Sequence, residues 1–116
     1  MLCPPFPKYL AMLELRPTCE HCNKALPPDA SDARICSYEC TFCAACVEGV
    51  LCNVCPNCGG GFVPRPVRPA QNRKGDNYLG KDPAGTQIRH RPVDVTAHAS
   101  FAATLRNISP AKRGEE

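Results

Sequence analysis

Eight cysteines fall in four close pairs between residues 19 and 58, and this spacing constrains the fold more than any other feature of the sequence. Within each pair only two or three residues intervene, so both sulfurs can turn toward one metal ion. Two such pairs supply the four thiolates of a tetrahedral zinc site, and eight thiols are enough for two zinc ions. The pairs are Cys19 with Cys22, Cys36 with Cys40, Cys43 with Cys46, and Cys55 with Cys58.

A domain of about 40 to 50 residues needs metal or disulfides, because it buries too little apolar surface to offset chain entropy. A secreted disulfide scaffold should follow a signal peptide, but the first residues, MLCPPFPKYLAMLEL, place prolines and a lysine where an apolar region belongs. No stretch reaches the ~20 apolar residues of a membrane span. We therefore expect a cytoplasmic protein with reduced, metal-binding thiols and no membrane contact.

The cysteine pattern and the 13 prolines divide the 116-residue chain into three parts. Residues 1–11 lack helical or strand periodicity, so we expect a disordered extension, with Met12 as a second plausible start. Residues 12–69 should form the zinc-binding domain, whereas residues 70–116 are polar and turn-rich, which predicts a basic, mostly disordered tail. Apolar periodicity in that tail predicts a short helix at about 95–108. Its apolar face would carry Ala97, Phe101, Leu105 and Ile108.

Local patterns within the zinc-binding domain predict a short β-hairpin followed by one short α-helix. Residues 34–42 are β-prone and interrupted by cysteines, which favours two short strands around a turn. Residues 43–51 favour a helix that Thr41 could cap, because cysteines and apolar residues recur at helical spacing. These residues are Cys43, Cys46, Val47, Val50 and Leu51. The small core expected between the metals consists of Ile35, Tyr38 and Phe42.

The net charge of +3 hides an asymmetry between the core and the tail. Residues 12–62 carry three basic and six acidic side chains, whereas residues 63–116 carry ten basic and five acidic ones. A zinc ion held by four thiolates carries a formal charge of about −2, so metal increases the contrast. The tail could therefore meet an acidic partner, fold back on its own core or bind nucleic acid, although few aromatic residues accompany its cations. The expected phosphate contacts are Arg65, Arg68, Arg73, Lys74, Arg89 and Arg91.

Two groupings of the four cysteine pairs satisfy the spacing. In the sequential grouping, the first two pairs bind one zinc ion and the last two bind the other. In the interleaved grouping, the first pair joins the third and the second joins the fourth, so that two metals lock one unit. Cys3 and Cys52 fall outside the pairing. Cys52 should pack as a small apolar residue, but its spacing to Cys55 and Cys58 also allows a ligand role.

The order of the cysteines, ending in Cys-Pro-x-Cys, resembles a RING finger in which Cys40 replaces the usual histidine at the fourth ligand position. The stretches MLELRPTCEHC, LPPD, ARICSYECTFCAACVE and VCPNCGG also resemble a bacterial family of short cysteine-rich proteins of unknown function. The RING resemblance implies a small metal-stabilised domain with the interleaved, cross-brace pairing. The implied zinc ligands are Cys19, Cys22, Cys43 and Cys46 at site 1, and Cys36, Cys40, Cys55 and Cys58 at site 2.

The expected metal sites are typical of structural zinc and not of catalysis. Four thiolates leave no coordination position for a catalytic water, and the sequence lacks a Ser-His-Asp set, a phosphate-binding glycine loop and paired catalytic carboxylates. We therefore expect a non-enzymatic zinc module that binds a protein partner. Ubiquitin-ligase-like activity is disfavoured, because Glu20 and Gly59 replace the aliphatic and cationic residues that such ligases use. Thiol redox chemistry or zinc buffering is a further alternative, which needs accessible thiolates.

Overall fold

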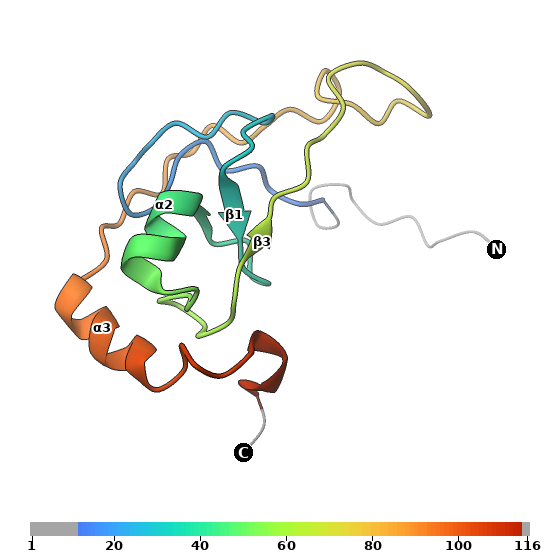
Figure 1. Ribbon diagram of the computed structural model, residues 1–116. Helices are drawn as coiled ribbons and strands as arrows, with labels where there is room; N and C mark the ends of the chain where they lie inside the picture. The colour runs from blue at the N-terminus through green and yellow to red at the C-terminus, as the bar shows by residue number, and fades with distance from the viewer. Residues whose placement is uncertain (1–11, 115–116) are drawn as a thin grey trace.

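The computed structural model describes residues 12–114, which fold around one small antiparallel sheet (Figure 1). The sheet has the strand order β2-β1-β3, with β1 pairing to both neighbours. Two helical segments flank it, and a short 3-10 turn lies near the end of the chain. The elements are β1 Ala33–Ile35, β2 Thr41–Cys43, α2 Ala44–Cys46, η1 Val47–Leu51, β3 Val63–Pro64, α3 Val95–Ala103 and η2 Pro110–Lys112.

The β1–β2 hairpin lies where the sequence predicts it, and its turn carries two cysteines. Cys36 N–H donates to the Cys40 carbonyl at 3.2 Å, and Glu39 closes the turn with a left-handed φ of 67°. Ile35 and Phe42 are buried, as the sequence predicts. Tyr38 is not a core residue, because it lies at the exposed tip of the turn with 73% of its surface accessible. That part of the core prediction is wrong.

The helix after β2 begins without an intervening loop. Cys43 precedes its first turn and makes no side-chain capping bond, while Thr41 lies in β2 and donates its hydroxyl hydrogen to the Glu39 carbonyl at 2.9 Å. The predicted Thr41 cap is therefore wrong. The predicted face is confirmed, since Cys46, Val47 and Leu51 are buried against the sheet. α2 is continued by the π-helical turn η1, and the helix ends at a left-handed residue directly after it.

Sulfur atoms and a few large side chains share one small core. Phe42 is 1% exposed, and its ring meets Phe62 edge-on with centroids 5.5 Å apart. Six of the buried members of this cluster are cysteines, so the apolar core and the thiols cannot be separated. The cluster contains Cys19, Leu26, Ala33, Cys36, Cys40, Phe42, Cys43, Cys46, Val47, Leu51 and Cys55.

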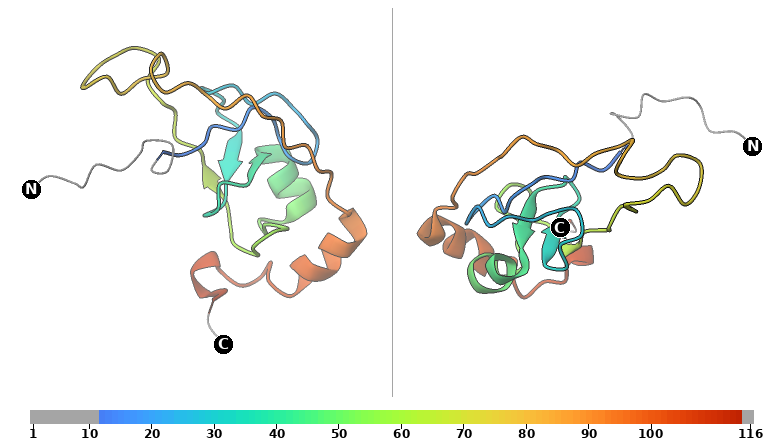
Figure 2. Two further views of the ribbon diagram at one scale, coloured as in Figure 1. Left: turned by 180° about the vertical axis from the view of Figure 1, so that it is seen from behind. Right: turned by 90° about the horizontal axis from the view of Figure 1, so that it is seen from above.

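The segment after residue 70 follows a defined path over the core, where the sequence predicts mostly disorder. Figures 1 and 2 draw it returning along the N-terminal segment before it enters α3. Gly85 N–H donates to the Leu15 carbonyl at 2.9 Å, and Arg91 N–H donates to the Glu20 carbonyl at 2.7 Å. These bonds join residues about seventy positions apart in the chain. No local periodicity encodes such contacts, so local sequence patterns could not reveal them.

α3 begins at the first residue of the predicted helical stretch and buries a different face. Asp94 caps it by accepting a hydrogen bond from Ala97 N–H at 3.0 Å. His98 and Ala102 are the buried residues, and His98 Nε2 lies 3.0 Å from the Leu51 carbonyl oxygen in η1. Phe101, expected on the apolar face, is 42% exposed. None of the helices within residues 12–114 is long and apolar enough to cross a membrane.

His98→Ala should loosen α3 from the core, because it removes the side-chain hydrogen bond to the Leu51 carbonyl, which then keeps only its bond from Val54 N–H. We expect a loss of about 0.5–1.5 kcal/mol in the local stability of α3. Faster hydrogen exchange of the α3 amides would measure this loss. Ser100→Ala, on the exposed side of the same helix, is the matched control and should leave exchange unchanged. Equal protection of α3 in both variants would contradict the docking contact.

Candidate metal centre

Four thiols converge where the loop before β1 meets the start of α2. The Sγ atoms of Cys19, Cys22, Cys43 and Cys46 all lie within 4.8 Å of one another. We call these four residues the first cysteine group. Three of them are buried, and Cys22 is exposed at the edge. Four thiols at this separation match the donor set of a tetrahedral metal site, so the group could hold one metal ion.

A second group of three thiols joins the hairpin turn to the loop after η1. The Sγ atoms of Cys36, Cys40 and Cys55 lie within 4.8 Å of one another, and all three residues are buried. We call these three the second cysteine group. Cys58, the fourth ligand that the sequence predicts, is exposed and lies outside the group. The structure therefore brings together seven of the eight predicted ligands, in groups of four and three.

Neither group draws its cysteines from consecutive pairs along the chain. The first group combines the first and third pairs, and the second combines the second pair with one member of the fourth. Cys52 belongs to neither group and is half-buried with a left-handed φ of 53°. Cys3 lies outside the described residues.

The loops that carry the thiols have the backbone geometry that Cys-x-x-Cys turns require. Asn23 and Gly59 directly follow the second cysteine of the first and last pairs, with φ of 65° and 77°. A Cβ at Gly59 would lie 3.2 Å from Leu105 Cδ1, so a side chain there would be strained and crowded. Backbone N–H groups also reach sulfur two residues earlier, from Tyr38 to Cys36 at 3.3 Å and from Asn57 to Cys55 at 3.4 Å.

Burial opposes ionisation of these thiols in the absence of a cation. It raises the pKa of Cys19, Cys40, Cys46 and Cys55, because a thiolate would lose its hydration there. Cys22 differs: partial burial acts upward on its pKa, but hydrogen bonds from the Lys24 N–H and neighbouring thiols lower it. A metal ion must displace the thiol protons, so metal binding should weaken as the pH falls.

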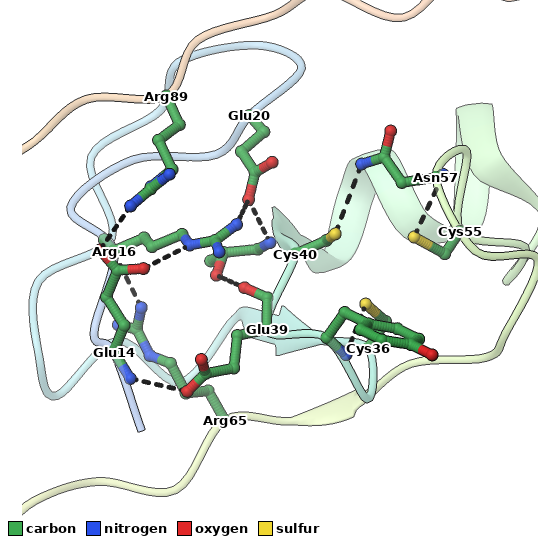
Figure 3. A network of polar contacts seen from close by, with 12 residues as sticks. Glu14, Arg16, Glu20, Cys36, Glu39, Cys40, Cys55, Asn57, Arg65 and Arg89 are labelled. Atoms are coloured by element: carbon green, nitrogen blue, oxygen red, sulfur yellow. Dashed lines mark hydrogen bonds and ion pairs between the residues drawn. The ribbon is translucent and has the colours of Figure 1, made fainter. Parts of the chain in front are cut away.

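Polar side chains lie near the thiols, and Figure 3 shows those of Glu20 and Asn57 together with the second group. Glu20 is buried next to Cys19, and its Oε2 accepts hydrogen bonds from Arg16 Nη1 at 2.9 Å and from Thr41 N–H at 2.5 Å. Asn57 Nδ2 donates to Cys40 Sγ at 3.4 Å (Figure 3). Glu20 therefore ties the loop of the first group to β2, and Asn57 supports a sulfur of the second. Sequence reasoning treated Glu20 only as a departure from the RING pattern.

A cleft of about 760 Å³ lies between this network and the C-terminal segment. Glu20 and Phe42 line its core side, while Arg91, His98 and Phe101 line the opposite side. Its size is within the range of small-molecule sites. Its lining mixes both charge signs with apolar side chains and does not single out a class of ligand.

Several cations expected to contact phosphate are engaged within the protein. Arg65 is 4% exposed and donates to three backbone carbonyls. Arg68 donates to the carbonyls of Leu13 and Asp82, and Arg89 forms an ion pair with Glu14 at 3.1 Å. The other three expected phosphate contacts are exposed: Arg73, Lys74 and Arg91.

Comparisons with known proteins place the cysteine-rich part of the chain in one family. A model of proteins of unknown function, DUF1272, matches residues 12–68. An uncharacterized protein of Rhizobium meliloti (strain 1021) is 57% identical over 75 residues, which is 65% of this chain and 82% of the relative. No solved structure matches the chain. These relatives supply no activity.

Cys43→Ser should abolish metal binding at the first group and unfold the core. Structural zinc contributes roughly 10–16 kcal/mol per site in small peptides, which exceeds the net stability of most domains. Cys52→Ser is the matched control, and we expect unchanged metal content and folding because Cys52 lies in neither group. Elemental analysis measures the metal content of each variant, and circular dichroism measures its folding. A folded Cys43→Ser protein with full metal content would contradict the grouping.

Proposed function

The chain belongs to the DUF1272 family of proteins of unknown function, and we propose that it is a structural zinc-binding module, not an enzyme, that presents a surface to a protein partner. The observation that carries the proposal is the convergence of seven thiols into two groups. A domain with so small an apolar core gains a large part of its folding free energy when such groups bind metal.

The donor set favours zinc over other metals. Groups of thiols without histidine or carboxylate suit zinc or iron–sulfur clusters, and a closed tetrahedral thiolate site is the commonest structural zinc site. Backbone N–H groups directed at sulfur support bound thiolates, as they would around a metal ion. In the proposed zinc form, Cys58 completes the second group and both ions are fully coordinated by protein. Bound zinc would then supply structure and leave no position for a reactive water.

A RING-like arrangement is the finer form of this proposal. Supporting features are the hairpin that enters a short helix and the assembly of each cysteine group from non-consecutive pairs. The proposal does not extend to ubiquitin transfer, because the residues that would grip a conjugating enzyme are absent from the sequence. A high density of reduced thiols is stable in a reducing compartment, so we propose a cytoplasmic location.

Exposed side chains at the tip of the β1–β2 hairpin and on β3 support the proposal of a protein partner. Tyr38 at the hairpin tip and Val63 on the edge strand β3 are 73% and 60% exposed. Aromatic residues with an accessible ring are enriched in protein interfaces. Nucleic-acid binding remains the alternative, resting on the exposed cations Arg73 and Lys74. It is weakened by the internal contacts of Arg65, Arg68 and Arg89.

Elemental analysis of freshly purified protein, combined with thiol alkylation before and after chelation, tests the zinc module. We expect two zinc ions per chain and eight protected thiols, which leaves two of the ten cysteines reactive. After chelation all ten should react. One zinc ion or none, oxidised cysteine pairs, or iron in place of zinc would overturn the proposal.

Site-specific photocrosslinking in bacterial cells tests the partner. A photoreactive residue at position 38 should capture one defined protein, whereas the same residue at the exposed position Gln71 should not. Capture of nucleic acid from position 71, lost at high salt, would favour the alternative function instead. The absence of a captured protein at position 38 would contradict a partner at this surface.

A further inference from the structure

Arg65 is a buried cation whose charge is not matched by a carboxylate. Only 4% of its surface is exposed, and none of the acidic side chains within residues 12–114 forms an ion pair with it. Its Nε atom is buried without a hydrogen-bond partner. Burial lowers the pKa of its guanidinium, because the charged form loses hydration. Burying a charge without an opposite charge lowers the stability of the fold, so we expect Arg65 to have a structural role that offsets this cost.

The guanidinium instead bridges the two ends of one loop. Its Nη1 donates to the Arg16 carbonyl at 2.9 Å, and its Nη2 donates to the carbonyls of Leu26 at 3.1 Å and Pro27 at 2.9 Å. Arg16 precedes the first Cys-x-x-Cys pair and Leu26 follows it. The planar guanidinium carries its donors on separate nitrogens, so it can bond carbonyls on both sides of the loop at fixed positions, whereas a lysine ammonium carries its three donors on one flexible nitrogen.

The bridged loop is the one that carries half of the first cysteine group. Its stem is closed by a bond from Leu26 N–H to the Pro17 carbonyl at 2.8 Å and by a bridge between Thr18 and Ala25. Cys19 and Cys22 lie inside the loop that both of these contacts close. The three contacts of Arg65 lie at the base of this stem, where they fix the separation of its two strands.

The backbone of Arg65 anchors the same residue to the sheet. Its N–H donates to the Ala33 carbonyl at 2.9 Å, directly after β3 pairs with β1. β3 in turn follows the last cysteine pair, Cys55 and Cys58. One residue therefore connects the chain that leaves the second cysteine group to the loop that carries two thiols of the first.

We propose that Arg65 is a positioning residue for the first metal site, closing the base of the loop that presents Cys19 and Cys22 so that both thiols face Cys43 and Cys46. The inference rests on the proposed metal-binding function and adds a specific residue to it. Arg65 touches no thiol and acts through the backbone carbonyls of the loop. Its own sequence position, in an arginine- and proline-rich run, indicated a solvent-facing cation.

The test compares metal release from the two groups in the full-length protein loaded with cadmium-113. Each bound ion gives its own NMR signal, and a correlation from the cadmium nucleus to the Cys22 β-protons of the wild-type protein identifies the signal of the first group. In Arg65→Met, which keeps side-chain length but removes all donors, we expect the first signal to be lost to a chelator on the order of 10- to 100-fold more readily than in the wild type. The second signal should respond less.

Two further variants keep the proposal testable if Arg65→Met fails to fold. Arg65→Lys keeps the charge but carries its three donors on one flexible nitrogen, so it should bridge the loop less well and show the same preference for loss at the first group with a smaller change. Arg73→Met is the matched control on an exposed arginine and should leave both signals unchanged. Equal loss of cadmium from both groups, or no change in Arg65→Met and Arg65→Lys, would overturn the positioning role of Arg65. A wild-type protein that binds no cadmium would instead overturn the metal-binding function itself.

Discussion

The convergence of thiols from overlapping stretches of chain is the constraint on which this fold depends. The first group spans residues 19 to 46 and the second spans 36 to 55, so each group encloses part of the other in sequence. The apolar side chains between them pack directly against sulfur-bearing residues and form no independent core. The free energy that orders the thiols therefore also orders the hydrophobic residues, which is the usual solution for domains of this size.

Backbone polar groups around the thiols are satisfied by charged side chains, which links the loops to the sheet. Glu20 accepts hydrogen bonds from Arg16 and from the N–H of Thr41. Thr41 lies in β2, between Cys40 of the second group and Cys43 of the first. Arg65 performs the complementary task and donates to carbonyls at the base of the first loop. Both side chains are buried, and their value lies in specifying how the segments meet. The C-terminal segment then covers this arrangement from residue 85 onward.

The two cysteine groups differ in how completely they are assembled. The first has all four thiols within 4.8 Å of one another, with Cys22 exposed, whereas the second has three buried thiols and the exposed Cys58 lies outside it. Each predicted set of four ligands therefore contains one accessible thiol. Exchange or oxidation would begin at these two thiols, because thiolate reactivity follows exposure.

Local patterns in the sequence indicated which residues could bind metal and predicted a β-hairpin that enters a short helix, because ligand spacing and side-chain period are local properties. Sequence reasoning placed Ile35 and Phe42 correctly in the core but also placed Tyr38 there, since strand propensity does not show which side chain lies at a turn tip. Three features arise from long-range packing: the burial of Arg65, the burial of His98 in place of Phe101, and the path of the tail. These features depend on hydrogen bonds between residues about forty to seventy positions apart, and no local pattern encodes which distant carbonyl a donor will meet.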